Sequence, residues 1–416
     1  MRTRKDADAG SRRRPACFGL LGPGHPLRGG IVHHNAMLFD ALKAEGHGIC
    51  AVGYSSLYPR FLFPGTTMVD HSLSPLGARA RPLLDPVRPW TWRQVVNQFH
   101  DSGVKAVVIH WWHSFHGPCL GRVARGLNRR GIPPVFLIHN AEPHDGMPFS
   151  SLLTRYALNG AHALIVQNRK TEENLKTRFP DKRLRLVPHP LYTPEAFGES
   201  RPNRAEARMA LGIDTRAHVL LFFGNVRRYK GLDLLLEAFK KTTVPGLHLL
   251  VAGEFYHDAS ALKTRLTESE FMNRVTLLDQ YIPNEEVSRV MTAADLVVLP
   301  YHRGSQSGVF SLASGHGRPV LATNVGGLPE YIENGVTGYT VPPDDAVAMA
   351  RTLDRFFKNQ EGPRMESEIR NRTEHSTWKD LARCISDLVL NPEPAHPDRT
   401  IPDRTTMRKQ RETNPV

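Results

Sequence analysis

The chain has 416 residues, of which 40% are hydrophobic and 23% charged, an ordinary composition for a soluble protein and a length that predicts two domains. Its four scattered cysteines show no metal-ligand spacing, and neither an export signal nor a bilayer-spanning apolar run is present, so we expect a cytoplasmic protein. The net charge of +13 favours anionic partners such as nucleic acid, an acidic membrane face or phosphorylated substrates, although a basic surface that only aids solubility explains it equally well.

The two ends of the chain differ in composition from the rest. Residues 1–14 hold six lysines and arginines against Asp6 and Asp8, and residues 391–416 are rich in proline. We expect both ends to be disordered tails, the first of them basic.

Between the tails, short apolar runs alternate with helical patterns, which predicts doubly wound parallel sheets covered on both faces. The predicted strands of the first half are Cys17–Leu21, Gly48–Gly53, Ala106–His110, Val135–Ile138, Leu164–Val166 and Leu184–Val187. A helix is predicted at Asn35–Glu45, and the first domain at residues 15–190.

The turn after the first predicted strand reads LLGPGHPLRGGIVHHNA. Gly29 and Gly30 precede a helical pattern, as they would in a loop whose backbone contacts phosphate. The full dinucleotide-binding fingerprint is absent, because the glycine spacing differs and no acidic residue ends the second strand.

Histidines cluster where two strands of the first half end, in VVIHWWHSFHGP and VFLIHNAEPH. A histidine in such a place can relay protons or hold a hydroxyl near neutral pH. Most lone histidines are structural, and His110 and His116 are interpreted in that way. His139 is the first candidate for a functional-site histidine, and His113 is the second.

Two neighbouring tryptophans follow the strand that ends at His110. Trp111 and Trp112 are either an apolar platform for a sugar or a lipid or, for at least one of them, part of the core.

The domain boundary is predicted in Pro188–Ala207, which carries four prolines and no apolar periodicity. Residues 191–207 are the predicted linker and residues 208–375 the second domain. Two doubly wound domains joined in this way leave a cleft, which the loops after the strands should face, because ligands bind open α/β sheets beyond the carboxyl ends of the strands.

The second half repeats the alternation of strands and helices. The predicted strands are Val219–Phe223, His248–Ala252, Val275–Leu278, Leu296–Leu299 and Val320–Ala322, and the predicted helices are Leu232–Lys240, Asn284–Ala293 and Asp344–Phe357.

One loop of the second half is strongly basic. FFGNVRRYKGLD, at Phe222–Asp233, places Arg227, Arg228 and Lys230 between a strand and a helix. Guanidinium and ammonium groups there can hold phosphate, and a solvated basic turn is the alternative.

A second loop, between Tyr301 and Glu330, is rich in glycine and serine. Ser307 can cap the following helix and Gly308 lets a ligand approach the backbone, although an ordinary helix cap has the same pattern. Glu330 either accepts hydrogen bonds from ligand hydroxyls or begins the next helix. Together the two loops suggest a diphosphate held between two α/β elements.

The sequence indicates neither a metal centre nor a hydrolytic site. Its only Asp-x-Asp is Asp6-Ala-Asp8 in the first tail, and it has no nucleophile elbow and no P-loop. We therefore expect a metal-independent transfer reaction without a bound cofactor.

At these residues the chain resembles the family 4 glycosyltransferases, retaining enzymes with two Rossmann-like domains facing each other across a cleft (the GT-B fold). The resemblance covers roughly residues 16–390 and rests on FFGNVRRYKGLDLLLEAF, VAGE, DQYIPNEEV, AADLVVLPY, SQSGV and GRPVLATNVGGLPEYIENGVTGYTVPP. In the first half, WWHSFHGP, FLIHN and VPHPLY look like one bacterial branch of the family. HSTWKDLARCISDLVL looks like the closing helix that crosses back onto the first domain, at residues 376–390.

The resemblance implies a role for each matching residue. The residues expected around the donor are Gly29, Gly30, Asn225, Arg227, Arg228, Lys230, Tyr281, Ile282, Ser307, Gly308, Val309 and Glu330. Of these, Tyr281 and Ile282 would lie beside the nucleotide base. His139 would sit near the reacting sugar and share the catalytic role with Lys230 and Arg227. The acceptor is expected at Trp112, His113 and Asn140.

The SQSGV region departs from the pattern of many family members, which carry two glutamates eight positions apart for the donor sugar and the ribose. Ser305 and Ala313 fall near those places, and the loop is one residue shorter, as in the branch with an SQSG- or TQSG-like loop. The resemblance therefore leaves the donor open.

We predict a retaining hexosyltransferase that moves a sugar from a UDP- or GDP-linked donor to an acceptor hydroxyl in polysaccharide or glycolipid synthesis. Its partners would be a glycan or lipid-linked acceptor and, peripherally, the acidic inner face of the membrane, but not nucleic acid. The alternatives are a nucleotide-sugar epimerase on the same fold, which usually needs carboxylates in the cleft, and a basic nucleic-acid-binding protein, which would need a binding module or aromatic residues along a basic stripe.

Overall fold

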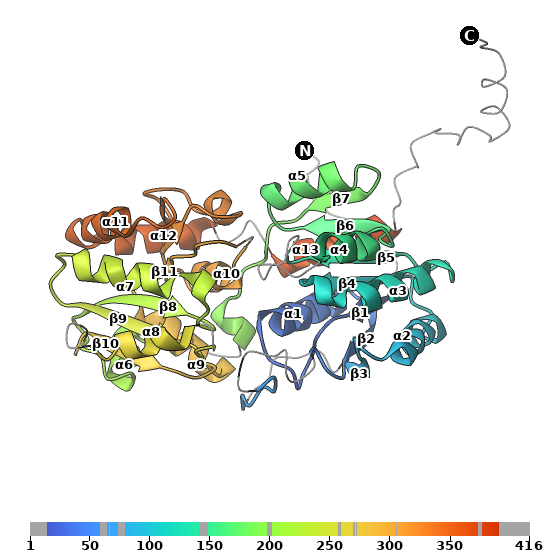
Figure 1. The fold of residues 1–416 in the computed structure, drawn as a ribbon, viewed down its shortest axis with the longest axis horizontal. Coiled ribbons are helices and arrows are strands. Elements are labelled where there is room, and N and C mark those ends of the chain that lie inside the picture. Colours follow the sequence, from blue (N-terminus) through green and yellow to red (C-terminus); the bar gives the residue numbers. More distant parts are fainter. Residues whose placement is uncertain are drawn as a thin grey trace, which may run out of the picture.

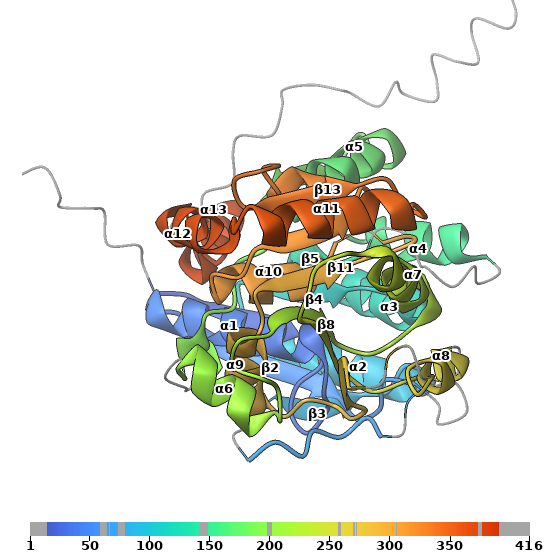
Figure 2. The ribbon, with the colours of Figure 1, turned by 90° about the vertical axis from the view of Figure 1, so that its left-hand side faces the viewer.

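The computed structural model describes residues 15–58, 65, 67–73, 80–140, 149–197, 202–256, 259–268, 271, 273–304, 306–372 and 377–390. They form two α/β halves that lie side by side, the first on the right of Figure 1 and the second on the left. Figure 2 looks from the side of the second half, which lies in front of the first. The two predicted tails lie outside the described residues.

The first half is built on a sheet of seven parallel strands in the order β3-β2-β1-β4-β5-β6-β7. The strands are β1 (Cys17–Leu21), β2 (Gly48–Tyr54), β3 (Arg81–Leu84), β4 (Ala106–Trp111), β5 (Pro134–Ile138), β6 (Ala163–Val166) and β7 (Arg183–Leu186). The helices are α1 (Gly30–Ala44), α2 (Pro89–Asp101), α3 (Gly117–Asn128), α4 (Ser150–Leu158) and α5 (Arg169–Arg178). Strands β4, β5 and β6 are buried at every position, which explains why their sequences are almost continuously apolar.

The second half has six parallel strands in the order β10-β9-β8-β11-β12-β13. They are β8 (His218–Phe223), β9 (Leu247–Ala252), β10 (Val275–Leu278), β11 (Leu296–Leu299), β12 (Val320–Thr323) and β13 (Gly338–Val341). The helices of residues 204–390 are α6 (Arg204–Ala210), α7 (Leu232–Lys241), α8 (Ser260–Arg265), α9 (Asn284–Ala293), α10 (Gly308–Gly315), α11 (Ala346–Lys358), α12 (Gly362–Arg372) and α13 (Trp378–Leu390). Helix α6 begins inside the predicted linker, residues 191–207.

The α/β prediction is confirmed, and every predicted strand is present within two residues of its expected bounds. The sequence analysis missed β3 and β13, which are four-residue strands at the outer edges of the two sheets. An edge strand tolerates residues such as Pro82 and Gly338, so it lacks the apolar run of a central strand. Helix α1 begins at Gly30, five residues before the predicted start.

Each sheet reverses its strand order at one place, between β1 and β4 in the first half and between β8 and β11 in the second. Connections leave these neighbouring strands in opposite directions, and a crevice opens beyond their carboxyl ends. The glycine-rich turns after β1, β8 and β11 all lie at such ends.

Helix α13 returns from the second half to the first, and it lies in red among the elements of the first half in Figure 1. Its side chains Leu381, Ile385 and Leu388 pack into the same buried cluster as Phe18 and Leu38. Consecutive described elements therefore lie in different halves at two places, between β7 and α6 and between α12 and α13.

Candidate active site

A cavity of about 270 Å³ lies between the two halves, at the carboxyl ends of the central strands. Both halves contribute to its wall. Of the residues predicted around the donor, those that line it are Gly29, Gly30, Asn225, Lys230, Tyr281, Ile282, Ser307, Gly308 and Val309.

Two helices begin at this cavity, α1 at Gly30 and α10 at Gly308, one from each half. Neither helix has a side-chain cap, and the hydroxyl of Ser307 instead pairs with the Tyr301 hydroxyl at 3.0 Å. A Cβ on Gly29, Gly30 or Gly308 would meet no atom within 4 Å, so the backbone there faces open space. Two such helix starts form a natural anion-binding site.

Lys230 adds a positive charge to the same wall. The turn that carries it depends on Gly231, which has φ +70°, and a Cβ there would lie 1.9 Å from the carbonyl oxygen of Pro300. The Lys230 ammonium lies over the backbone of Gly224, 3.2 Å from where a Cβ on that glycine would be. Burial, helped by the charge of Arg227, lowers the pKa of Lys230 to about 8. The ammonium is therefore cationic at neutral pH and would be stabilised by an anion.

The two arginines of the RRYKG turn do not line the cavity. Arg227 is half-buried, with its guanidinium 5.9 Å from the ring centre of Tyr229 and 5.5 Å from that of Tyr256. Arg228 is exposed. The structure therefore brings Lys230, rather than either arginine, into direct contact with the cavity.

The sequence analysis did not single out Arg28 and Glu254, which form an ion pair between the two halves. Their side chains are only 7% and 6% exposed. The Arg28 guanidinium also lies 4.8 Å from the ring centre of Tyr281, and the Tyr281 hydroxyl lies 3.4 Å from His33 Nε2 on α1. The Tyr281 ring that was predicted beside the base is thus held from the first half.

Glu330 lies outside the cavity lining and contacts the first half in another way. Its carboxylate accepts hydrogen bonds from the backbone N–H groups of Arg169, at 2.7 Å, and Lys170, at 3.0 Å, at the start of α5. The neighbouring Tyr331 hydroxyl donates to the carbonyl of Gln167. In this conformation both oxygens of Glu330 are used by the protein, and its predicted contact with the donor stays a prediction.

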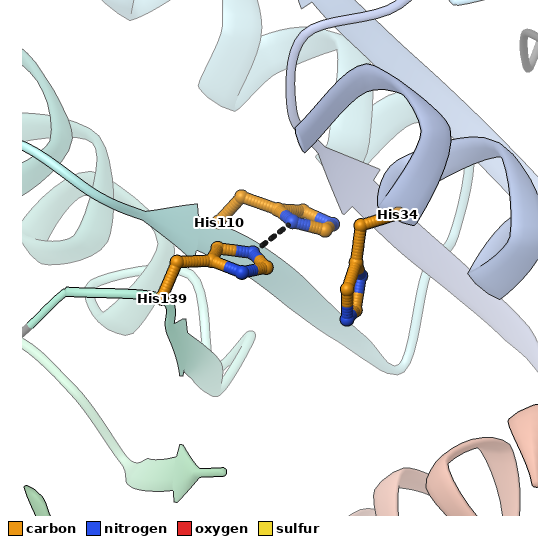
Figure 3. A group of neighbouring side chains, drawn as sticks. All are labelled: His34, His110 and His139. Carbon is orange, nitrogen blue, oxygen red and sulfur yellow. Dashed lines mark hydrogen bonds between the residues drawn. The ribbon is translucent and has the colours of Figure 1, made fainter. Parts of the chain in front are cut away.

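Three buried histidines from different elements meet in the first half (Figure 3), and none of them, the predicted catalytic His139 included, is among the residues that line the cavity. His139 follows β5, His110 lies in β4 and His34 in α1. His110 Nδ1 and His139 Nε2 are hydrogen-bonded at 2.9 Å, and the His34 ring meets the His139 ring edge-on with centres 4.6 Å apart. Burial lowers the pKa of His110 to about 3 and that of His34 and His139 well below the ordinary value, so all three rings are neutral at pH 7.

A chain of hydrogen bonds joins this cluster to the cavity wall. Gln306, which lines the cavity, donates from Nε2 to Gln167 Oε1 at 2.7 Å, and Gln167 Nε2 is hydrogen-bonded to His34 Nε2 at 3.0 Å. The sequence analysis missed these three residues and treated His110 as structural. Gln306 lies in the SQSGV loop and His34 is one of the two histidines that follow Gly30, but no local sequence pattern showed that these side chains meet.

The nitrogens of His34, His110 and His139 lie within 4.8 Å of one another, and three imidazoles are a donor set that suits a metal such as zinc. One nitrogen of each ring already takes part in a hydrogen bond, to another histidine or to Gln167. In the structure the three rings thus belong to a hydrogen-bonded network that uses one nitrogen of each ring.

The predicted acceptor residues lie together at the ends of β4 and β5. Trp112 is 9% exposed, its indole N–H donates to the Tyr58 hydroxyl at 2.9 Å, and its ring packs on His116 with centres 4.4 Å apart. It is thus part of the core here, as is Trp111. His113 Nδ1 accepts from the backbone N–H of Phe115, and Asn140 donates to the carbonyl of Trp112 at 3.5 Å.

Two parallel α/β halves with helix N-termini and a lysine at a shared cavity have the geometry and charge that suit a phosphorylated ligand between the domains. Residues 217–359 match the family described as glycosyl transferases group 1, and residues 29–190 match the glycosyl transferase 4-like domain. D-inositol 3-phosphate glycosyltransferase of Mycobacterium sp. (strain KMS) is 31% identical over 335 residues, which are 75% of this chain and 74% of the relative. The chain therefore belongs to the group 1 glycosyltransferases of family 4.

Solved structures agree with the fold. Sucrose-phosphate synthase from Thermosynechococcus elongatus has a TM-score of 0.68 at 20% identity, covering 90% of this chain and 98% of its own. Anabaena HepE in complex with UDP and glucose has a TM-score of 0.68 at 16% identity, and the match covers 90% of this chain and 99% of the HepE chain. The GT-B fold is thus confirmed. Within the described part of the chain, no helix combines the length and the apolar character needed to cross a membrane.

Proposed function

We propose that this glycosyltransferase is a retaining enzyme that transfers a hexose from a nucleotide sugar to an acceptor hydroxyl in polysaccharide or glycolipid synthesis. The observation that carries the proposal is the convergence of Lys230 and the N-termini of α1 and α10 at one cavity. The HepE structures, which share the fold, are complexes with UDP and with UDP-glucose and support a UDP-linked donor.

In the proposed mechanism the donor diphosphate lies between the two helix starts and beside Lys230. Negative charge develops on this diphosphate as the sugar leaves, and the fixed N–H groups and the ammonium stabilise it. The leaving phosphate then takes the proton of the acceptor hydroxyl, so the mechanism needs no carboxylate base. Tyr281 and Ile282 flank the base, Arg227 adds positive potential, and His139 contacts the reacting sugar.

The experiment that tests the donor is thermal unfolding in the presence of UDP, GDP, ADP and their sugars. A nucleotide that binds only the folded protein stabilises it by about 2.7 kcal/mol at one hundred times its Kd. We expect UDP and a UDP-hexose to raise the melting temperature, and the transferred sugar to keep its anomeric configuration in the NMR spectrum of the product. No shift with any nucleotide would refute the proposal.

We also propose that transfer needs no divalent metal ion, because Lys230 and the helix N-termini supply the positive charge that a metal would provide. Turnover is then expected to survive dialysis against EDTA. Loss of turnover that Mn²⁺ or Mg²⁺ restores would contradict this part of the proposal.

Peripheral binding to the acidic inner face of the membrane, as suits a lipid-linked acceptor, is the last part of the proposal. Helix α4 and the residue before it expose Phe149, Leu152 and Tyr156, which are 77%, 63% and 38% accessible, beside the exposed Arg155. Apolar side chains among basic ones suit an anionic lipid surface. The protein should sediment with phosphatidylglycerol vesicles at low salt, and Leu152→Asp should weaken this; no sedimentation at low salt would favour a soluble acceptor.

A further inference from the structure

We infer that His110 is a positioning residue that holds His139 as the tautomer with its proton on Nδ1, which makes His139 a hydrogen-bond donor to the sugar and not a base. The contact with a sugar rests on the proposed function. The pairing of the two rings does not, because it follows from the structure of the first half alone.

The backbone and the neighbouring rings hold His139 in place beside His110. Strands β4 and β5 are parallel neighbours, and the backbone N–H of His139 donates to the carbonyl of Trp111 at 2.8 Å. The planes of the two imidazoles differ by 10° with centres 5.1 Å apart, so the hydrogen bond lies close to the plane of both rings. The His34 ring lies beside His139 in Figure 3, and the planes of the two rings meet at 83°, which restricts the rotation of His139.

The hydrogen bond can run in either direction, and burial distinguishes the two. Each neutral ring carries one proton. If His139 Nε2 donated, His110 would carry its proton on Nε2, an atom that is buried without a partner among the described residues. A buried N–H without an acceptor is rarer and more costly than an unused lone pair. The favoured arrangement therefore has His110 Nδ1–H donating to His139 Nε2.

This direction fixes the chemistry of His139. Its Nε2 lone pair is occupied by the proton of His110, and its own proton lies on Nδ1. The ring then has no lone pair with which to remove a proton from the acceptor, and it can donate to an oxygen of the sugar. The lowered pKa values of both rings agree, because neither ring gains a second proton near pH 7.

Nitrogen-15 NMR of the histidine-labelled full chain tests the tautomer without any substrate, with the His139 signals assigned by their loss in His139→Ala. We expect His139 to show a protonated Nδ1 and an unprotonated Nε2. His110→Asn, whose amide can donate from the position of Nδ1, should keep this state, whereas His110→Leu should mix the two tautomers. His116→Leu is the matched control, since His116 is equally buried but makes no recorded contact with His139. A His139 protonated on Nε2 in the unmodified protein would overturn the inference.

Turnover tests whether His110 acts through His139. Loss of one hydrogen bond predicts that His110→Leu lowers kcat roughly fivefold to tenfold with little change in the KM of the donor, while His110→Asn stays within about threefold. In a His139→Ala background, His110→Leu should cost nothing more, and fully additive losses would overturn the positioning role. If no nucleotide sugar supports turnover at all, the proposed function fails, while the NMR result still decides the tautomer.

Discussion

Lys230 shows how the turn around a residue places its side chain at the cavity. Gly231 lets the chain reverse beneath the carbonyl of Pro300, and Gly224 leaves room for the ammonium above its backbone. The neighbouring Arg228 is part of the same sequence motif but is exposed. The motif therefore supplies three cations, and the turn brings Lys230 to the cavity.

Lys230→Ala is expected to lower turnover about a hundredfold, because a positive charge beside the leaving diphosphate contributes roughly 3 kcal/mol to the transition state. Circular dichroism should show that the variant is folded. The control is Lys241→Ala, at the far end of α7, where the lysine is exposed. Near-normal turnover in the folded Lys230 variant would remove this residue from the mechanism.

Donor affinity is expected to fall as the pH rises above about 8, the pKa of Lys230 in the free protein. An anionic donor binds the protonated lysine, so affinity is level below this pKa and declines above it by up to about tenfold per pH unit. The stability of the free protein changes in the opposite direction. Between pH 8 and the ordinary lysine pKa of 10.5, the contribution of Lys230 to stability rises with pH, because the unfolded chain still holds the proton that the folded chain has released.

Titration calorimetry with a UDP-hexose between pH 7 and 9.5 measures the change in affinity. Lys230→Arg keeps its charge over this range and should flatten the profile. An unchanged slope in that variant would assign the pH dependence to another group.

At the scale of the elements, the starts of three helices define the inter-domain region. Helices α1 and α10 begin at the cavity without side-chain caps, whereas the start of α5 is capped from both halves. Asn168 accepts from the backbone N–H of Thr171, and Glu330 accepts from the next two N–H groups toward the N-terminus. The same backbone N–H groups make a contact between the halves in α5, whereas in α1 and α10 they are the groups that we propose bind the donor.

Glu330→Ala is expected to lower the free energy of unfolding by about 1 kcal/mol, the usual contribution of a helix cap with a favourable charge. Urea unfolding measures the loss. Glu368→Ala is the control, because it removes only a half-exposed ion pair with Arg372. A larger fall in donor affinity than in stability would show instead that Glu330 contacts the donor, as the sequence analysis expected.

At the scale of the whole molecule, side chains hold the two halves together around the cavity. Arg28 pairs with Glu254, Gln306 bonds to Gln167, and Glu330 caps α5. These contacts lie at different parts of the inter-domain region, so their joint formation closes the cleft. Opening of the cleft must break these contacts. The binding free energy of the donor must therefore compensate for any contact that the donor displaces.

Glu254→Ala is expected to open the cleft in the absence of ligand. An unpaired buried charge costs about 3–5 kcal/mol, and domain opening returns Arg28 to water without unfolding either half. Small-angle X-ray scattering should show a larger radius of gyration. The double variant Arg28→Met/Glu254→Leu, which leaves no unpaired charge, should restore the compact form, and an unchanged radius in Glu254→Ala would show that the ion pair does not hold the cleft closed.

The sequence by itself determined every strand except the two edge strands β3 and β13, the order of the two halves and the loops that meet at the cavity. Central parallel strands are apolar on both faces, and the glycine turns and Lys230 follow them directly, so these features are visible in short stretches of sequence. The same locality explains why the sequence analysis expected Gly30, Ser307, Gly308 and Lys230 at the cleft between the halves, where they line the cavity.

Only the tertiary structure decided which polar side chains meet. Arg28 and Glu254 are separated by 226 positions and Gln167 and Gln306 by 139, so neither pair leaves a local pattern. His110 and His116 are equally buried and were indistinguishable in the sequence, yet only the first is recorded in contact with His139 among the described residues. The packing of β4 against β5 and the closure of the two halves make that distinction, because both depend on contacts between residues far apart in the chain.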